Sequence, residues 1–125
     1  MMVNVGLGVI FAKRLKNYPK DDRVKILSFM HHVQVNGFDG LEGRNKFSDD
    51  VDKDDPIYIR KVRYVNQHVL WHYHIGIESY NMTNPFGDRT SRYVLHYSRK
   101  EINTIKIADM DEHPPFNLPV EDFLD

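Results

Sequence analysis

The sequence predicts an α+β fold in which a small antiparallel sheet packs on two N-terminal helices. Two observations predict it. Apolar side chains recur one helical turn apart near the start of the chain, and they alternate with polar side chains in its second half. The length of 125 residues, with 41% hydrophobic residues, suits a single domain spanning residues 1–125. Because the chain has no cysteine, disulfide scaffolds and cysteine-based zinc sites are excluded.

The N-terminal half is expected to hold one strand and two helices. Residues 3–10 are β-branched and glycine-rich, which favours a short strand. Helical spacing follows over residues 11–18 and is interrupted by Pro19. A second helix over residues 21–36 begins with two aspartates, whose negative charge suits a helix N-terminus, and is stopped by a glycine. Residues 37–55 are rich in glycine and aspartate and show no sustained period, which predicts a long loop.

The second half of the chain is expected to supply most of the sheet. Residues 56–67 keep helical spacing after a proline and are expected to form a short helix. Residues 78–90 are rich in turn formers and are expected to form an extended loop. The proline-rich tail is irregular until a turn at residues 121–124. Alternation predicts three strands, the last two forming a hairpin, over residues 68–77, 91–99 and 103–110.

The overall charge excludes some broad classes of protein. Seventeen Lys and Arg against 18 Asp and Glu give a net charge of −1, which argues against a protein that binds nucleic acid through bulk positive charge. The longest apolar run, residues 5–12, is shorter than the ~20 residues that span a bilayer. The basic residues follow this run rather than precede it, so no secretory signal is expected. We therefore expect a cytoplasmic protein that does not bind membranes.

The three predicted strands place apolar and titratable side chains on opposite faces, because successive residues of a strand alternate in direction. The odd-numbered positions are expected to face the two helices, with Trp71, Tyr73, Leu95 and Ile105 buried. The even-numbered positions are expected to form an open face that carries His72, His74, Arg92, His96 and Lys106. The net charge of the whole chain does not indicate this patch, because the acidic loop and tail offset its positive charge.

These residue types suit the cleavage of RNA without a metal. Such a reaction needs a base for the 2′-OH proton, cations for the charge on phosphorus, and an acid for the leaving oxygen. The catalytic candidates are His72, His74, Arg92 and His113. Arg44 and Lys46 lie in a small basic cluster of the long loop that suits phosphate binding. His96 and Lys106 are further candidates for RNA contact.

Two other classes of function fit the same residues. His72 and His74 could hold a metal with His96 or His113 as a third ligand, which would make the chain a small metalloenzyme. Arg92 on the same face would repel a cation. The long loops could instead serve a noncatalytic binding module.

Four segments of the chain are diagnostic in combination: GLEGRNK at residues 40–46, LWHYHIGI at 70–77, RYVLHY at 92–97 and IADMDEHPPF at 107–116. Together they resemble the YafO-type branch of the RelE/ParE superfamily of bacterial toxins. The predicted order of a strand, two helices, a loop, a strand and a hairpin is similar to that superfamily as well.

The resemblance implies the toxin of a type II toxin–antitoxin pair, an mRNA interferase that cleaves mRNA on the ribosome, needs no cofactor and is silenced by a cognate antitoxin. In the family two basic residues alternate on the strand after the helices, and His72 and His74 occupy those positions. Arg92 takes the place of an arginine that contacts the scissile phosphate, and His113 that of a residue after the last strand. His96 matches no family motif. A ParE-like gyrase inhibitor is the alternative within the same superfamily.

Overall fold

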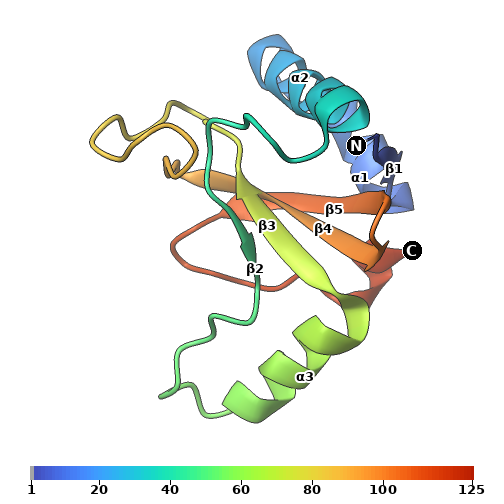
Figure 1. Ribbon diagram of the computed structural model, residues 1–125. Helices are drawn as coiled ribbons and strands as arrows, with labels where there is room; N and C mark the ends of the chain where they lie inside the picture. The colour runs from blue at the N-terminus through green and yellow to red at the C-terminus, as the bar shows by residue number, and fades with distance from the viewer. Residues whose placement is uncertain (1) are drawn as a thin grey trace.

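Three α-helices and a five-stranded mixed sheet form the α+β fold of the computed structural model, which describes residues 2–125 (Figure 1). The elements follow one another as β1 (Asn4–Leu7), α1 (Val9–Leu15), α2 (Lys20–Asn36), β2 (Asn45–Phe47), α3 (Tyr58–His68), β3 (Leu70–His74), β4 (Tyr93–Glu101), β5 (Thr104–Glu112) and the 3₁₀ helix η1 (Glu121–Leu124). The strand order in the sheet is β1-β5-β4-β3-β2.

The observed elements confirm the predicted fold class and correct it in two places. Strand β1 runs parallel to β5, so the expectation of an antiparallel sheet is wrong for this pair. Two helices separate β1 from the rest of the sheet, and such a long connection leaves the direction of a strand free. Strand β2 lies inside the segment expected to be a loop, because its three residues are too few to show alternation.

One face of the sheet packs against α1 and α2, as the sequence predicts (Figure 1). Phe29 of α2 stacks on Tyr73 of β3 with ring centroids 4.6 Å apart. Leu95 is fully buried in the same core, and Trp71 packs against it while half-buried. The odd-numbered side chains of β3 and β4 therefore face the N-terminal helices, as the alternation predicts.

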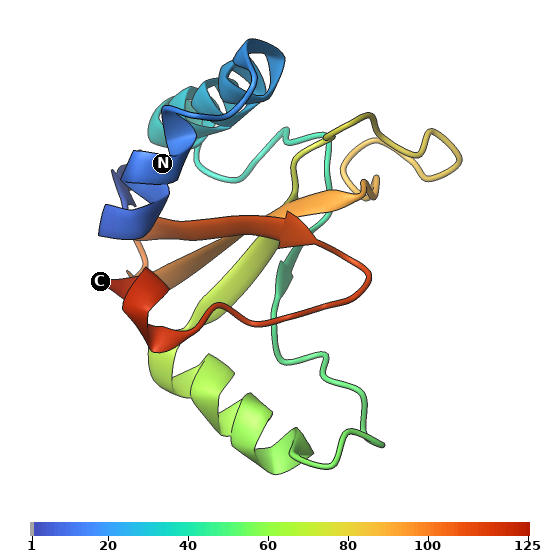
Figure 2. The same cartoon turned by 180° about the vertical axis from the view of Figure 1, so that it is seen from behind.

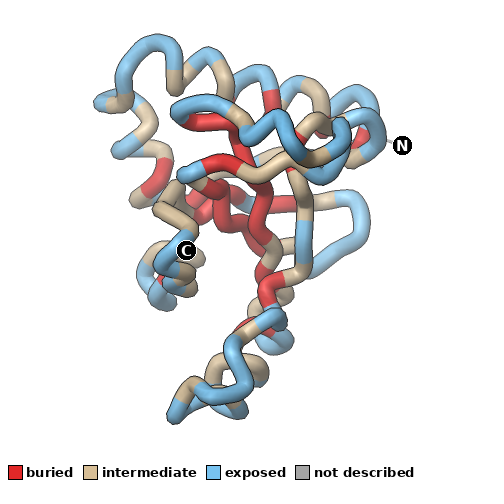
Figure 3. The backbone as a smooth tube through the Cα atoms, turned by 90° about the vertical axis from the view of Figure 1, so that its left-hand side faces the viewer, coloured by how far each residue is buried: buried red, intermediate tan, exposed pale blue. Residues whose placement is uncertain are grey.

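The other face of the sheet is covered, which overturns the expectation of an open even face. The C-terminal segment, residues 113–125, folds back across this face on the side of α3 (Figure 2). The Tyr64 hydroxyl of α3 donates to the Pro119 carbonyl oxygen at 2.7 Å and joins the helix to this segment. Both odd- and even-numbered positions of β3 and β4 are accordingly buried, and buried residues are coloured red along the tube in Figure 3. Alternation predicts the direction of a side chain but not what covers it.

Gly43 lies where the segment before β2 passes close to β3. Its N–H donates to the Tyr73 hydroxyl at 3.1 Å. A Cβ atom at this position would overlap the His74 carbonyl oxygen and would lie 2.7 Å from the Tyr80 hydroxyl oxygen. Only glycine fits between these atoms, so the close approach of the two segments depends on the missing side chain.

We expect Gly43→Ala to lower the free energy of unfolding by ~1–3 kcal/mol, toward the upper end because the obstacle is backbone. Gly6→Ala is the matched control, since a Cβ atom there meets nothing closer than the Ile105 carbonyl oxygen at 3.8 Å. Urea unfolding followed by circular dichroism measures both. Equal midpoints for the two variants would show that the close approach at Gly43 contributes nothing to stability.

Candidate functional site

Four histidine rings gather on the face of the sheet that the C-terminal segment covers. We call this group the histidine cluster: His72, His74, His96 and His113. The His113 ring centroid lies 5.5 Å from that of His72 and 5.4 Å from that of His74, and the His96 centroid lies 6.3 Å from that of His72. The Phe116 ring lies 4.6 Å from His72 and 4.7 Å from His113, which closes the cluster from one side.

Strand register brings these four residues together. His72 and His74 share a face of β3 because they are two residues apart. In the antiparallel β3–β4 pair His72 is opposite His96. His113 directly follows β5, and its N–H donates to the Arg92 carbonyl oxygen at 2.8 Å, so the start of the C-terminal segment is held beside the start of β4.

Two serines orient two of the imidazoles. His72 Nδ1 lies 2.8 Å from Ser48 Oγ, and His74 Nδ1 lies 3.0 Å from both the N–H and the carbonyl oxygen of Ser91. Among residues 2–125, both ring nitrogens of His96 and Nδ1 of His113 are buried without a hydrogen-bond partner. The sequence gives no signal for either serine, because each is far along the chain from the histidine that it contacts.

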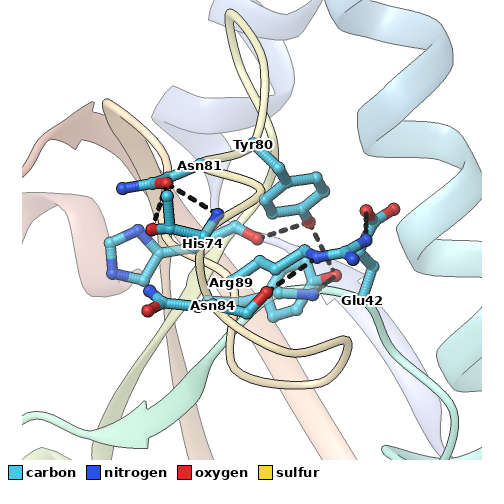
Figure 4. Close-up of polar contacts among 9 residues, drawn as sticks. Glu42, His74, Tyr80, Asn81, Asn84 and Arg89 are labelled. Carbon is cyan, nitrogen blue, oxygen red and sulfur yellow. Dashed lines mark hydrogen bonds and ion pairs between the residues drawn. The ribbon is translucent and has the colours of Figure 1, made fainter.

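A tyrosine pair fixes the backbone beside His74. The Tyr80 hydroxyl donates to the His74 carbonyl oxygen at 2.6 Å and lies 3.0 Å from the Tyr73 hydroxyl (Figure 4). Burial raises the pKa of both phenols, so they remain protonated hydrogen-bond donors. In the same view Arg89 pairs with Glu42 at 2.8 Å and holds the loop between β3 and β4 against the segment before β2.

Burial keeps the histidine cluster neutral. It lowers the pKa of His72 to about 3 and that of His96 to about 4, because a charged imidazole loses its hydration there. Burial also lowers the pKa of His74 and of His113. Near pH 7 all four rings therefore offer lone pairs rather than positive charge, in contrast to the fixed cations that lysine would supply.

An open hollow of about 630 Å³ lies on one side of the cluster. We call it the arginine–histidine hollow, and its lining includes Arg44, His74, Tyr80, Asn81, Arg92 and His113. These residues come from the segment before β2, from β3, from the loop after it, and from positions next to the ends of β4 and β5. A hollow of about 700 Å³ along α3 contains Arg60 and Arg63 but no histidine.

The two arginines of the hollow are paired with carboxylates. Arg44 Nε lies 2.7 Å from Asp88, and Arg92 lies 3.1 Å from Glu78 and 3.2 Å from Glu112. The Arg92 side chain is 57% exposed. Ion pairs this exposed contribute only ~0–1 kcal/mol, so a phosphate oxygen can take the place of a carboxylate at little cost.

The structure brings half of the predicted site residues into the hollow and separates the others from it. Arg44, His74, Arg92 and His113 line it. His72 and His96 are buried, at 1% and 0% exposure, outside its lining. Lys46 is exposed and pairs with Asp50 at 3.1 Å. Lys106 lies toward the other end of the β4–β5 hairpin, with its Nζ 3.4 Å from the Leu124 carbonyl oxygen.

Comparison of the chain with family models, curated proteins and solved structures gave no match. Between residues 2 and 125 no helix is both long and apolar enough to cross a membrane.

The burial of neutral histidines makes stability depend on pH. The folded pKa values of His72 and His96 lie below the unfolded value of 6.5, so their contribution is complete above pH 6.5 and is lost as the pH falls toward 4. Each ring should remove up to ~1.4 kcal/mol of unfolding free energy per pH unit in this window. Urea midpoints between pH 7 and pH 5 measure the slope.

The matched variants are His96→Leu and His31→Leu. The first removes a buried titrating ring and should flatten the slope, whereas the second replaces an exposed residue of α2 and keeps all four rings of the histidine cluster, so the slope that they cause should remain. A slope of the same size in His96→Leu and in the wild type would show that the His96 ring is not held neutral by burial.

Proposed function

We propose that the chain is an endoribonuclease, a YafO-like toxin of a type II toxin–antitoxin pair that cleaves mRNA on the ribosome without a metal. The observation that carries the proposal is the arginine–histidine hollow. It brings two guanidinium groups, Arg44 and Arg92, beside two neutral imidazoles, His74 and His113. Guanidinium groups bind phosphate well, and neutral imidazoles can transfer protons near pH 7.

The proposed reaction is attack by the ribose 2′-oxygen on the adjacent phosphorus. A neutral imidazole of the hollow takes the 2′-OH proton as the new P–O bond forms. The bond from phosphorus to the 5′-oxygen breaks, and a protonated imidazole gives that oxygen a proton. The products are a 2′,3′-cyclic phosphate and a 5′-hydroxyl. We assign these proton transfers to His74 and His113, because both line the hollow.

The guanidiniums hold the charge that develops on the phosphate. Arg92 and Arg44 release their carboxylate partners and bind phosphate oxygens, which the exposure of both pairs permits. A bound phosphate also raises the pKa of a neighbouring histidine, which favours the protonated ring that the leaving oxygen needs. His72 acts as a positioning residue behind His113, since it is buried and lies against that ring.

The other three predicted RNA contacts, Lys46, His96 and Lys106, differ in whether their position lets them reach the RNA. Lys46 is exposed and belongs to the same segment as Arg44, so it extends the phosphate-binding surface. His96 is buried, and Lys106 lies at the far end of the hairpin, so the proposal does not use them as contacts to the cleaved nucleotide. The partners in this proposal are the ribosome with its mRNA and a cognate antitoxin, all in the cytoplasm.

We expect Arg92→Ala and His113→Ala each to lower the rate of mRNA cleavage on purified ribosomes by ~100-fold or more, because one removes a phosphate donor and the other a proton-transfer group. Arg23→Ala on α2 is the control with the same change of charge, outside the hollow. A chelator that binds zinc but spares the ribosomal Mg²⁺ should leave cleavage intact.

The chemistry of the RNA ends separates this proposal from its rivals. Attack by the 2′-oxygen leaves 5′-hydroxyl ends, whereas metal-assisted hydrolysis by water generally leaves 5′-phosphate ends. Induced expression in bacteria provides a second test, in which the wild type should arrest growth and the two hollow variants should not. Equal growth of all strains, or 5′-phosphate ends, would overturn the proposed function.

A further inference from the structure

We propose that the histidine cluster also binds one transition-metal ion of the zinc class, held by His72, His74 and His113. This inference goes beyond the proposed function and does not depend on it. Among the described residues, these three histidines each offer a ligating nitrogen, and the three nitrogens lie within 4.8 Å of one another. They come from β3 and from the residue that follows β5, so the fold itself brings them together.

The spacing of the nitrogens is close to that of a zinc site. Zinc binds imidazole nitrogens at ~2.0–2.1 Å in a tetrahedral arrangement, which places neighbouring nitrogens ~3.3 Å apart. The three nitrogens of this cluster, which lie within 4.8 Å of one another, need to approach by no more than ~1.5 Å to reach that spacing.

The hydrogen bonds around the rings select the nitrogens that would bind the ion. A histidine ligand usually donates its other ring N–H to an oxygen nearby. His72 Nδ1 lies within hydrogen-bond distance of Ser48 Oγ, and His74 Nδ1 accepts from the Ser91 N–H and lies equally close to the Ser91 carbonyl oxygen, so Nδ1 of each ring already has a protein partner. Both arrangements leave Nε2 as the ligand. In His113 the buried Nδ1 has no hydrogen-bond partner within residues 2–125, so its lone pair is available to an ion.

The charges around the cluster permit a cation. The rings themselves are neutral at pH 7, the state in which imidazole binds metals. Arg92, which alone would repel a cation, is paired with both Glu78 and Glu112, so this group of three side chains carries a net negative charge. Arg44 and Lys46 are each paired with an aspartate.

Three protein ligands leave one position of a tetrahedral zinc ion open. His74 and His113 line the arginine–histidine hollow, so this position would face the hollow, where water or a phosphate oxygen can reach it. The ion would occupy the same lone pairs that take protons in the proposed cleavage of RNA. If the proposed function holds, zinc therefore inhibits it reversibly.

The test is metal binding by the purified full-length chain, measured without RNA. Competition with a chromophoric chelator gives the affinity for Zn²⁺, and the visible absorption of bound Co²⁺ reports a tetrahedral site. We expect one ion per chain. His113→Ala should weaken binding by at least ~100-fold, and Ser48→Ala, which removes only the hydrogen bond to His72, by ~10- to 100-fold.

The control is the double variant His31→Ala and His32→Ala, which removes an adjacent histidine pair on α2 and should leave the affinity unchanged. Circular dichroism confirms that each variant is folded. Absence of stoichiometric binding, binding that survives His113→Ala, or binding that is lost in the α2 control overturns the metal site. A chain that binds zinc but never cleaves RNA would refute the proposed function alone, and one that cleaves but binds no zinc would refute the metal site alone.

Discussion

The burial of the histidine cluster beneath the C-terminal segment is the constraint from which the properties of the site follow. Phe116 packs against His72 and His96, and the segment is joined to α3 through Tyr64. Removing water from the rings disfavours their charged form and lowers their pKa values. The sequence pattern predicts a solvent-exposed, positively charged face, whereas in the fold the histidines of this face are buried and neutral. The fold thus keeps these histidines in the neutral form, in which one ring nitrogen offers a lone pair.

The lone pair of a neutral imidazole can accept a proton or bind a metal ion, but it cannot do both at once. A lone pair that accepts a proton from a 2′-OH cannot at the same time coordinate a metal. The hydrogen bonds from Ser48 and Ser91 orient His72 and His74 for either use, because both require one ring nitrogen to be held and the other to be free. The arginines outside the cluster distinguish the two uses, since guanidinium groups bind phosphate and not metal ions.

The sequence predicts which histidines share one face of a strand, but it does not predict what covers them. Alternation places His72 and His74 on one face of β3, and the same rule places Tyr73 in the core, because both depend only on the period of a strand. The cover over His72 could not be predicted, because the proline-rich tail has no period that indicates where it packs. The contacts of Ser48 and Ser91 with the histidines could not be predicted either, because they depend on the register between segments that are distant in the sequence.

A chain with a net charge of −1 does not gather RNA by long-range attraction. In the arginine–histidine hollow each guanidinium already has an acidic partner, so a phosphate that enters exchanges one anion for another. Such an exchange yields little net binding energy for free RNA, because the broken ion pair offsets the one that forms. Under the proposed function the ribosome must therefore supply the affinity by presenting the mRNA at high local concentration, while the hollow supplies the geometry. Near-neutral charge then favours RNA held on a ribosome over RNA free in solution.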